Sequence, residues 1–251
     1  MKRLFVLSAV LVLLFSACTK NPEVGVVPIG PENYIPASVN EYFTLHGVPD
    51  NIYPQVKYLF DEATDYQYPF PTGVIAPNIE GQFLMNPYRC IYSSDAAYIN
   101  AVMSNRKIYL YNQHNGFCSY YSKQSQTLSF ADTICIMGNE NRFLAFYVDI
   151  VDDVKDLAGK GCSMTDEDGL LYHIEEYPYY VKTLIMFTGE RIPDSCMKDC
   201  FFIRYILEKN DPGYIDADGI EWTMAKPEGT IEITKDDDGL TEQYEWFEVN
   251  N

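Results

Sequence analysis

Positive charge and histidine are scarce in this sequence. The 251 residues include 18 Lys and Arg against 36 Asp and Glu, with three histidines and a net charge of −18. Such an acidic surface repels phosphates and anionic lipid headgroups, so we expect no nucleic-acid partner and no electrostatic attachment to a membrane. Because histidines are so few, the sequence also predicts no metal centre and no cofactor. A solvated acidic surface is the simplest explanation of the charge.

Familiar catalytic motifs are also missing. The sequence contains no G-x-S-x-G, no P-loop and no G-x-G-x-x-G. A pair of carboxylates for glycoside cleavage cannot be singled out, because 36 acidic residues offer many pairs. We therefore expect a protein without catalysis, and a hydrolase of polysaccharide or peptide is the alternative.

Long apolar runs are absent after the first residues of the chain. Residues 1–3 are Met-Lys-Arg, and residues 4–17, LFVLSAVLVLLFSA, carry no charge. As a helix this run would measure about 21 Å, whereas the core of a bilayer is about 30 Å thick. A basic start, an apolar middle and small residues at the end predict a secretory signal peptide over residues 1–17. The alternative is a buried N-terminal helix.

The end of this run carries a recognisable motif. Phe15-Ser16-Ala17-Cys18 resembles the lipobox of bacterial lipoproteins, with Phe15 in the place where Leu is usual. The resemblance implies cleavage before Cys18, a diacylated Cys18 side chain and an acylated new N-terminus. Several acyl chains attach a protein stably to a bilayer. It thus implies an exported protein that is anchored to a membrane through Cys18. The Tyr and Trp content together with this anchor resembles the cell-envelope lipoproteins of gut-type Gram-negative bacteria, which implies the outer membrane.

Proline and glycine punctuate the stretch after Cys18. Residues 19–38 contain four prolines and two glycines, which disfavour helix and favour extended chain. We expect residues 18–38 to be the lipidated cysteine and a tether, and residues 39–251 to be a single β-rich domain. An edge strand over residues 24–29 is the alternative for part of the tether.

Two segments have the spacing of helices. In residues 54–65 Pro54 suits the first turn, and four apolar residues fall on one helical face. These are Val56, Leu59, Phe60 and Ala63. Residues 94–104 are predicted as a second helix, capped by Ser94.

The rest of the chain has the texture of strands. Asn115-Gly116 is a strong hairpin signal, and residues 179–190 are predicted as a strand. Residues 200–211 fit a strand better than a helix. Three acidic turns end in Asp-Gly, which accepts positive φ, so we expect hairpins there too. They are residues 166–169, 216–219 and 236–239.

These elements predict a mainly antiparallel, sandwich-like β domain with a few short helices towards its N-terminal side. A small or partial β-propeller is the alternative. The D-x-D-G turns also resemble part of a calcium loop, but the first ligand position holds Met164, Tyr214 or Thr234 rather than an acid. Turns without metal are therefore expected.

Six cysteines follow Cys18. An exported protein meets oxidising conditions and an even number permits full pairing, so we expect at least one disulfide among them. Free buried thiols are the alternative. The six are Cys90, Cys118, Cys135, Cys162, Cys196 and Cys200.

Aromatic residues are abundant, with 21 Tyr and 14 Phe but only two Trp. Sugars present flat C–H faces that pack on aromatic rings, while neighbouring acids accept hydrogen bonds from their hydroxyls. Each Trp follows a glutamate, and three tyrosines surround Pro178. The predicted ligand-binding residues are therefore Trp222, Trp246, Tyr177, Tyr179 and Tyr180. The alternative is that these rings pack inside the protein.

Together these features predict a membrane-anchored, exported binding module, with glycans as the expected ligand. The alternatives are a structural partner of another envelope protein and a polysaccharide hydrolase. A flat, exposed aromatic row would favour glycans, and a bare sheet edge or an apolar patch would favour assembly. A cleft with two close acids would favour the hydrolase.

Overall fold

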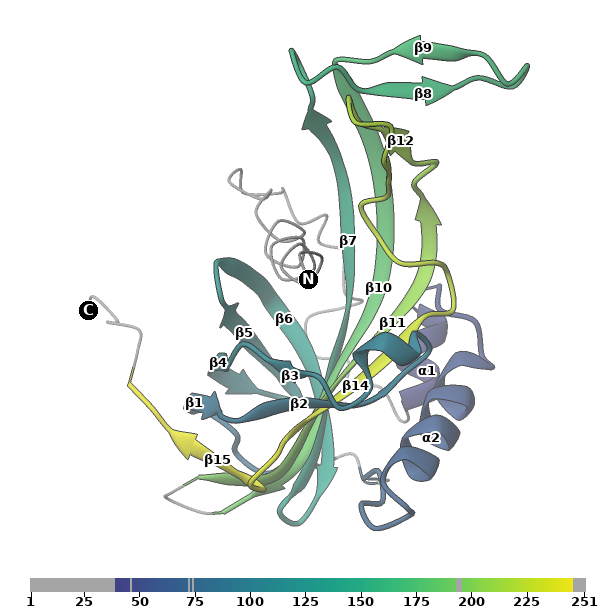
Figure 1. Cartoon of the computed structure of the whole chain (residues 1–251). Coiled ribbons are helices and arrows are strands. Elements are labelled where there is room, and N and C mark those ends of the chain that lie inside the picture. The colour runs from purple at the N-terminus through teal and green to yellow at the C-terminus, as the bar shows by residue number, and fades with distance from the viewer. Residues whose placement is uncertain (1–38, 46, 72, 74, 193–195, 246–251) are drawn as a thin grey trace.

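The computed structural model describes residues 39–45, 47–71, 73, 75–192 and 196–245 (Figure 1). The predicted signal peptide, Cys18 and the tether lie outside these residues, as does Trp246, and remain predictions. Helices α1 (Val39–Leu45) and α2 (Ile52–Ala63) come first in this part of the chain. Neither they nor any other helix of the described residues is long and apolar enough to cross a membrane.

One large antiparallel sheet dominates the fold, and eight of its strands close into a ring. The order β10-β7-β6-β5-β4-β1-β15-β11 returns to its start because β11 also pairs with β10, while β14, β2 and β3 continue beyond β11. The strands are β1 (Gly81–Met85), β2 (Tyr88–Ser93), β3 (Val102–Met103), β4 (Arg106–His114), β5 (Phe117–Gln124), β6 (Thr127–Asn139), β7 (Arg142–Asp156), β10 (Glu176–Arg191), β11 (Met197–Asn210), β14 (Ile231–Asp236) and β15 (Leu240–Gln243).

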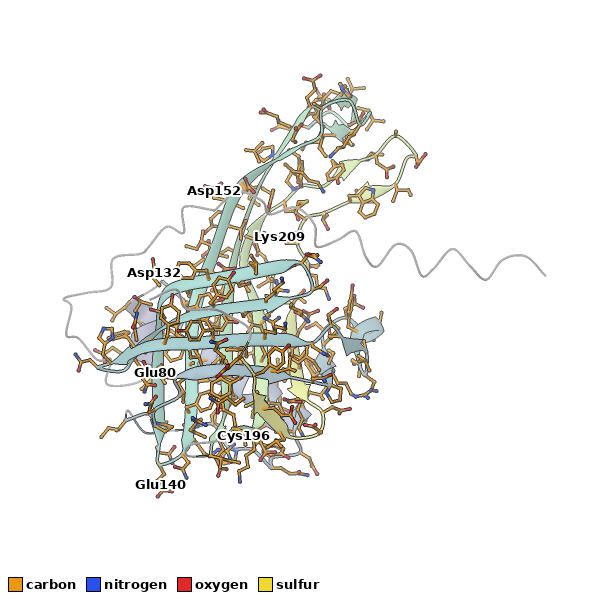
Figure 2. All side chains as sticks on the ribbon, turned by 90° about the vertical axis from the view of Figure 1, so that its left-hand side faces the viewer. Glu80, Asp132, Glu140, Asp152, Cys196 and Lys209 are labelled. Atoms are coloured by element: carbon orange, nitrogen blue, oxygen red, sulfur yellow. The ribbon has the colours of Figure 1, made fainter. Side chains whose placement is uncertain are left out.

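The prediction of a mainly antiparallel β fold with short helices near its N-terminal side is confirmed. The arrangement is sandwich-like, since β4 and β5 run across the long strands β7 and β10 that lie behind them in Figure 2. The propeller alternative is wrong, because eleven of the strands join one continuous sheet instead of separate blades.

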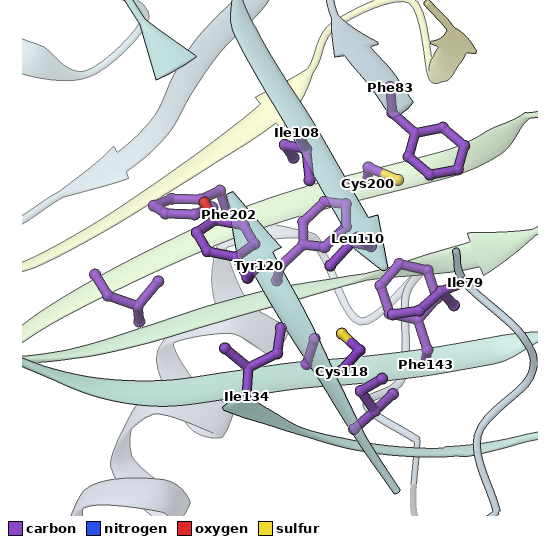
Figure 3. Packing of buried hydrophobic residues seen from close by; sticks show 14 of the residues in the cluster. Ile79, Phe83, Ile108, Leu110, Cys118, Tyr120, Ile134, Phe143, Cys200 and Phe202 are labelled. Atoms are coloured by element: carbon purple, nitrogen blue, oxygen red, sulfur yellow. The ribbon is translucent and has the colours of Figure 1, made fainter. Parts of the chain in front are cut away.

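Two apolar layers stabilise the ring of strands and the two helices beside it. Inside the ring, alternate side chains of β4 and β5 meet those of β7 and β11, including Ile108, Tyr120, Phe143 and Phe202 (Figure 3). On the outer side of β7, β10 and β11, the two helices form a second core. There the rings of Phe60 and Phe201 lie 5.0 Å apart, edge to face.

Most of the local predictions are confirmed. Helix α2 buries the predicted face, with Val56 and Phe60 inaccessible to solvent. Asn115 and Gly116 turn the chain from β4 to β5 with φ of 47° and 79°, as a two-residue hairpin loop requires. The strands expected over residues 179–190 and 200–211 are β10 and β11.

The helix predicted over residues 94–104 is wrong. Only a single 3₁₀ turn forms, Ala96–Tyr98, and none of its residues is buried. The N–H of Asn100 instead donates to the carbonyl of Cys90 at 2.8 Å, which draws the chain back to β2. A short segment without an apolar face to bury gains too little to stay helical.

Two of the three acidic turns are hairpins and the third is not. Residues 166–169 join β8 (Ser163–Thr165) to β9 (Leu171–His173), and residues 216–219 join β12 (Tyr214–Ile215) to β13 (Glu221–Trp222). Residues 236–239 instead link β14 to β15, which lie end to end along the same side of β11. Both strands pair with the longer β11 rather than with each other.

The two acidic hairpins form a small sheet of their own, in the order β13-β12-β8-β9. It lies at the far end of β7 and β10, away from the helices (Figure 1). We call residues 151–181 and 206–228 the arm, and the rest of the described residues the body. A third apolar cluster, which includes Leu157, Tyr177 and Ile206, packs this small sheet onto the arm's long strands.

Candidate functional site

The three predicted tyrosines have different positions. Tyr177 and Tyr179 are buried in the core of the arm, and the Tyr177 ring lies 5.1 Å from that of Tyr214. The Tyr177 hydroxyl donates to the carboxylate of Asp211 and accepts from the N–H of Gly213. Buried rings cannot stack on a sugar, so Tyr177 and Tyr179 are structural. Tyr180 is half-buried on β10, where burial and then Glu208 raise the pKa of its hydroxyl.

Trp222 also belongs to the arm. Its ring is half-buried against the arm's core, and its Nε1–H donates to Oδ2 of Asp216 at 2.7 Å. The structure thus brings Trp222 near Tyr177 and Tyr179, but around a core rather than around an open site.

A different set of rings lies side by side on the surface of the body. Tyr109 of β4 is directly opposite Tyr121 of β5, and Tyr121 is directly opposite Phe130 of β6. Tyr111, two residues along β4, stacks on Tyr109 with ring centroids 4.6 Å apart. We call these four residues the aromatic face. Figure 2 looks onto this side of the molecule, with Asp132 and Glu80 towards one edge.

Strand alternation places these rings outside. Ile108 and Leu110 of β4 point into the ring of strands and are fully buried, so the residues beside them point outwards. Tyr109, Tyr111 and Tyr121 are half-buried, and Phe130 keeps 40% of its surface exposed. Neighbouring strands are about 4.8 Å apart, so the row across three strands is about 10 Å long.

Polar groups surround the aromatic face. Lys107 of β4 is directly opposite Lys123 of β5, two residues along each strand from Tyr109 and Tyr121. The Lys107 ammonium lies 5.0 Å from the centre of the Tyr244 ring. On the other side, the Ser119 hydroxyl donates to the carbonyl of Asp132 at 2.9 Å. Burial raises the pKa of Tyr111, so its hydroxyl stays neutral and able to donate.

Comparison with protein-family models, curated proteins and solved structures finds no match. The candidate site therefore rests on geometry and chemistry alone.

A hydrolytic cleft is not supported by the described residues. A hollow of about 350 Å³, open to solvent, lies in the arm, and Glu221 is the only acid in its lining. Burial raises the pKa of Asp236 to about 6, but this carboxyl is fully buried in the body and out of a substrate's reach. The lining of this hollow therefore does not hold the pair of close acids that a glycosidase needs.

The six cysteines are free thiols in the structure, so the expected disulfide does not form in it. Five of them are buried. Cys118 and Cys135 lie on neighbouring strands, but Cys118 points into the ring of strands and Cys135 into the core beneath the helices. Opposite faces of a sheet cannot be bridged by a disulfide. Burial raises the pKa of Cys90 to about 11 and that of Cys135 to about 12, which makes these thiols unreactive.

The described residues also contain no group of three or more His, Cys, Asp or Glu side chains arranged to hold a metal ion. In the two hairpins, the first acid of each D-x-D-G turn accepts hydrogen bonds from the backbone of its own turn. Oδ1 of Asp166 accepts from the N–H groups of Asp168 and Leu170. Oδ1 of Asp216 accepts from the N–H groups of Asp218 and Ile220.

Proposed function

We propose that this protein is an exported, lipid-anchored module that binds glycans on its aromatic face. One observation carries the proposal: Tyr109, Tyr121 and Phe130 stand in register across three strands, with Tyr111 stacked beside them. A row of this kind offers aromatic surface on which the C–H faces of sugar rings can pack, with the Tyr121 and Phe130 rings 63° apart in orientation, and nearby polar groups can meet the sugar hydroxyls.

The shape of the surface favours long ligands. A closed pocket grips a single small molecule on most sides, whereas a row of rings on a sheet supports only one side of its ligand. We therefore expect polysaccharide chains, or several sugar units of one, to bind better than monosaccharides. Lys107, Lys123 and Asp132 flank the rings and can donate to or accept from sugar hydroxyls.

The lipobox resemblance supplies the location. With Cys18 acylated, residues 19–38 would connect the domain to the bilayer, and at about 3 Å per residue an extended tether reaches some tens of Å. That length would let the aromatic face meet polymers beyond the lipid headgroups.

The test is a binding screen of the complete lipoprotein, extracted in mild detergent, against a panel of soluble and insoluble polysaccharides. We expect saturable binding to one class of glycan, weakened about tenfold by Tyr121→Ala, which equals about 1.4 kcal/mol. Tyr58→Ala is the matched control, because Tyr58 is an exposed tyrosine on α2, far in the fold from β5.

Three results would contradict the proposal. One is silence across the panel. Another is binding that survives Tyr121→Ala while the variant keeps the melting temperature of the parent. The last is an equal loss in Tyr121→Ala and Tyr58→Ala, which would show that the effect is not specific to the aromatic face.

A further inference from the structure

The tip of the arm exposes apolar side chains that a folded protein usually covers. Leu170, Leu171 and Tyr172 keep 65%, 63% and 47% of their surface exposed. These three residues are consecutive in the β8–β9 hairpin, and we call them the tip patch. Ile220 of the β12–β13 hairpin is also exposed, but β12 runs antiparallel to β8, so its turn lies at the opposite end of the small sheet. Neighbouring exposed apolar side chains of this kind mark interaction sites.

The patch is joined to a free sheet edge. β9 is the last strand of the small sheet, and within the described part of the chain only β8 pairs with it. Asp166 donates to the carbonyl of Leu170, and Ile174 donates to that of Cys162, both at 2.9 Å. Since antiparallel pairs alternate, these bonds fix Leu171 and His173 as the residues whose N–H and C=O point away from β8.

The arm is also strongly acidic. It carries 14 Asp and Glu against four Lys, a net charge of −10, which is more than half of the −18 of the whole chain. Asp166, Glu167 and Asp168 precede β9, and Glu175 and Glu176 follow it, all exposed. An apolar edge between two groups of acids attracts a basic partner and repels an acidic one.

We propose that β9 is a docking edge for an extended segment of another protein, one that alternates apolar residues with Lys or Arg. The segment would add to the small sheet as a fifth strand. Its backbone would pair with Leu171 and His173, its apolar side chains would cover the tip patch, and its cations would face the flanking acids. Strand addition of this kind takes affinity from the backbone and specificity from side chains.

The charge of the arm argues against other occupants. A second copy would bring its own acids against these, and like charges at an interface oppose binding. An anionic lipid surface is repelled for the same reason.

The arm holds its tip in a fixed position. The carboxylate of Asp211 is buried, accepts from the N–H of Ala225 at 2.7 Å and lies 3.6 Å from the Lys209 ammonium. With the Tyr177 hydroxyl it ties the base of the small sheet to the long strands. A partner therefore meets a preformed edge, which lowers the entropic cost of docking. This proposal is independent of glycan binding, because the aromatic face lies on the body.

The test uses the complete lipoprotein in mild detergent and a fluorescent peptide that alternates Lys with Val, compared with one that alternates Glu with Val. We expect the Lys peptide to bind at micromolar to high-micromolar concentration and more weakly as salt increases, and the Glu peptide not to bind. No binding of the Lys peptide up to about 1 mM would overturn the proposal.

A proline at the edge tests the geometry. In Leu171→Pro the lost N–H is one that points outwards, so the hairpin keeps its own hydrogen bonds while strand addition is blocked. We expect binding of the Lys peptide to fall about tenfold. Leu171→Val keeps the N–H and should bind within about twofold of the parent. Equal binding of the Lys peptide by the parent, Leu171→Pro and Leu171→Val would show that the peptide is held by diffuse charge attraction alone, and would refute the docking edge.

Two more readouts separate the other occupants. Sedimentation that shows a dimer lost in Leu171→Pro would assign the edge to a second copy and overturn the proposal. Replacing Glu167 and Glu175 by Gln should weaken binding of the Lys peptide and reduce the dependence of that binding on salt, because both carboxylates are exposed beside β9. An unchanged salt dependence would contradict the role of these acids.

Discussion

The body and the arm are built from the same strands but solve the problem of sheet edges differently. In the body, eight strands close on one another and leave no edge in the ring. In the arm, β7, β10 and β11 run beyond the ring and end at a four-stranded sheet whose two outer strands have one neighbour each in the described structure. Closure leaves the ring itself without an edge, whereas β3 at the end of the body's sheet and β9 and β13 of the arm each keep an open edge within the described residues.

The two regions also differ in what their surfaces carry. The body sets rings outwards on the outer surface of its closed sheet, between Lys107 and Lys123 on one side and Asp132 on the other. The arm sets aliphatic side chains at its tip among acids. We propose sugars as the ligand of the first surface and a basic polypeptide as the partner of the second. Under these two proposals the molecule recognises two kinds of partner at separate places.

The largest effect is expected from a change in the core of the body. Phe60 is fully buried between α2 and the sheet, with its ring 4.5 Å from that of Phe70. Phe60→Ala should lower the free energy of unfolding by about 3–5 kcal/mol. Because β7, β10 and β11 belong to both regions, the arm should unfold with the body. Urea titration followed by far-UV circular dichroism and, in a Trp246→Phe background, by Trp222 emission should give coincident curves, and separate curves would contradict this coupling.

Removing a buried polar contact in the arm should destabilise the arm more than the body. Asp211→Ala leaves the Tyr177 hydroxyl and the N–H of Ala225 without their acceptor in the arm's core. The expected loss is about 3 kcal/mol, because each unsatisfied buried group costs about 1–3 kcal/mol. Hydrogen exchange should accelerate at Ile215 and Trp222 but not at Ile108. Faster exchange at all three would show that the arm has no independent opening.

Pattern and turn chemistry are enough to predict most of the body's strands. The alternation around Ile108 and Leu110 and the Asn-Gly turn together predict the β4–β5 hairpin and which residues face the solvent. The register is a different matter. His114 pairs with Phe117, but a bulge beside Asn112, which has φ of 55°, shifts the pairing by one residue and brings Tyr109 opposite Tyr121. No signal in the residue types marks that shift.

The burial of Tyr177 and Tyr179 was missed for a related reason. Residues 177–180 alternate so that Tyr177 and Tyr179 face one side of β10, but sequence does not say whether that side meets solvent or a second sheet. Their burial depends on β12 and its neighbours, about 35 residues further on. The prediction for residues 94–104 failed because helix propensity is weak without a core to pack on. Long-range packing decides all of these cases.

The smallest of these effects is a dependence of the body's stability on pH. Oδ2 of Asp236 accepts from the Thr241 hydroxyl at 2.7 Å, while Oδ1 is buried with no partner among the described residues. Burial raises the pKa of this carboxyl to about 6 from 3.8. The folded protein therefore holds a proton that the unfolded chain releases between about pH 4 and pH 6. The stability from this proton is present below pH 4 and lost as the pH rises through 6.

Asp236→Asn should remove that dependence, which amounts to about 2 kcal/mol between pH 4 and pH 7. Urea midpoints measured at unit steps of pH should decline with rising pH in the parent and decline less in the variant, where Asp149, whose pKa burial also raises, is unchanged. Asp237→Asn is the matched control, because the neighbouring carboxylate is partly exposed and pairs with Arg89 at 2.8 Å. If Asp236→Asn keeps the slope of the parent, the buried carboxyl is not its source, and the acids of the arm become the groups to replace next.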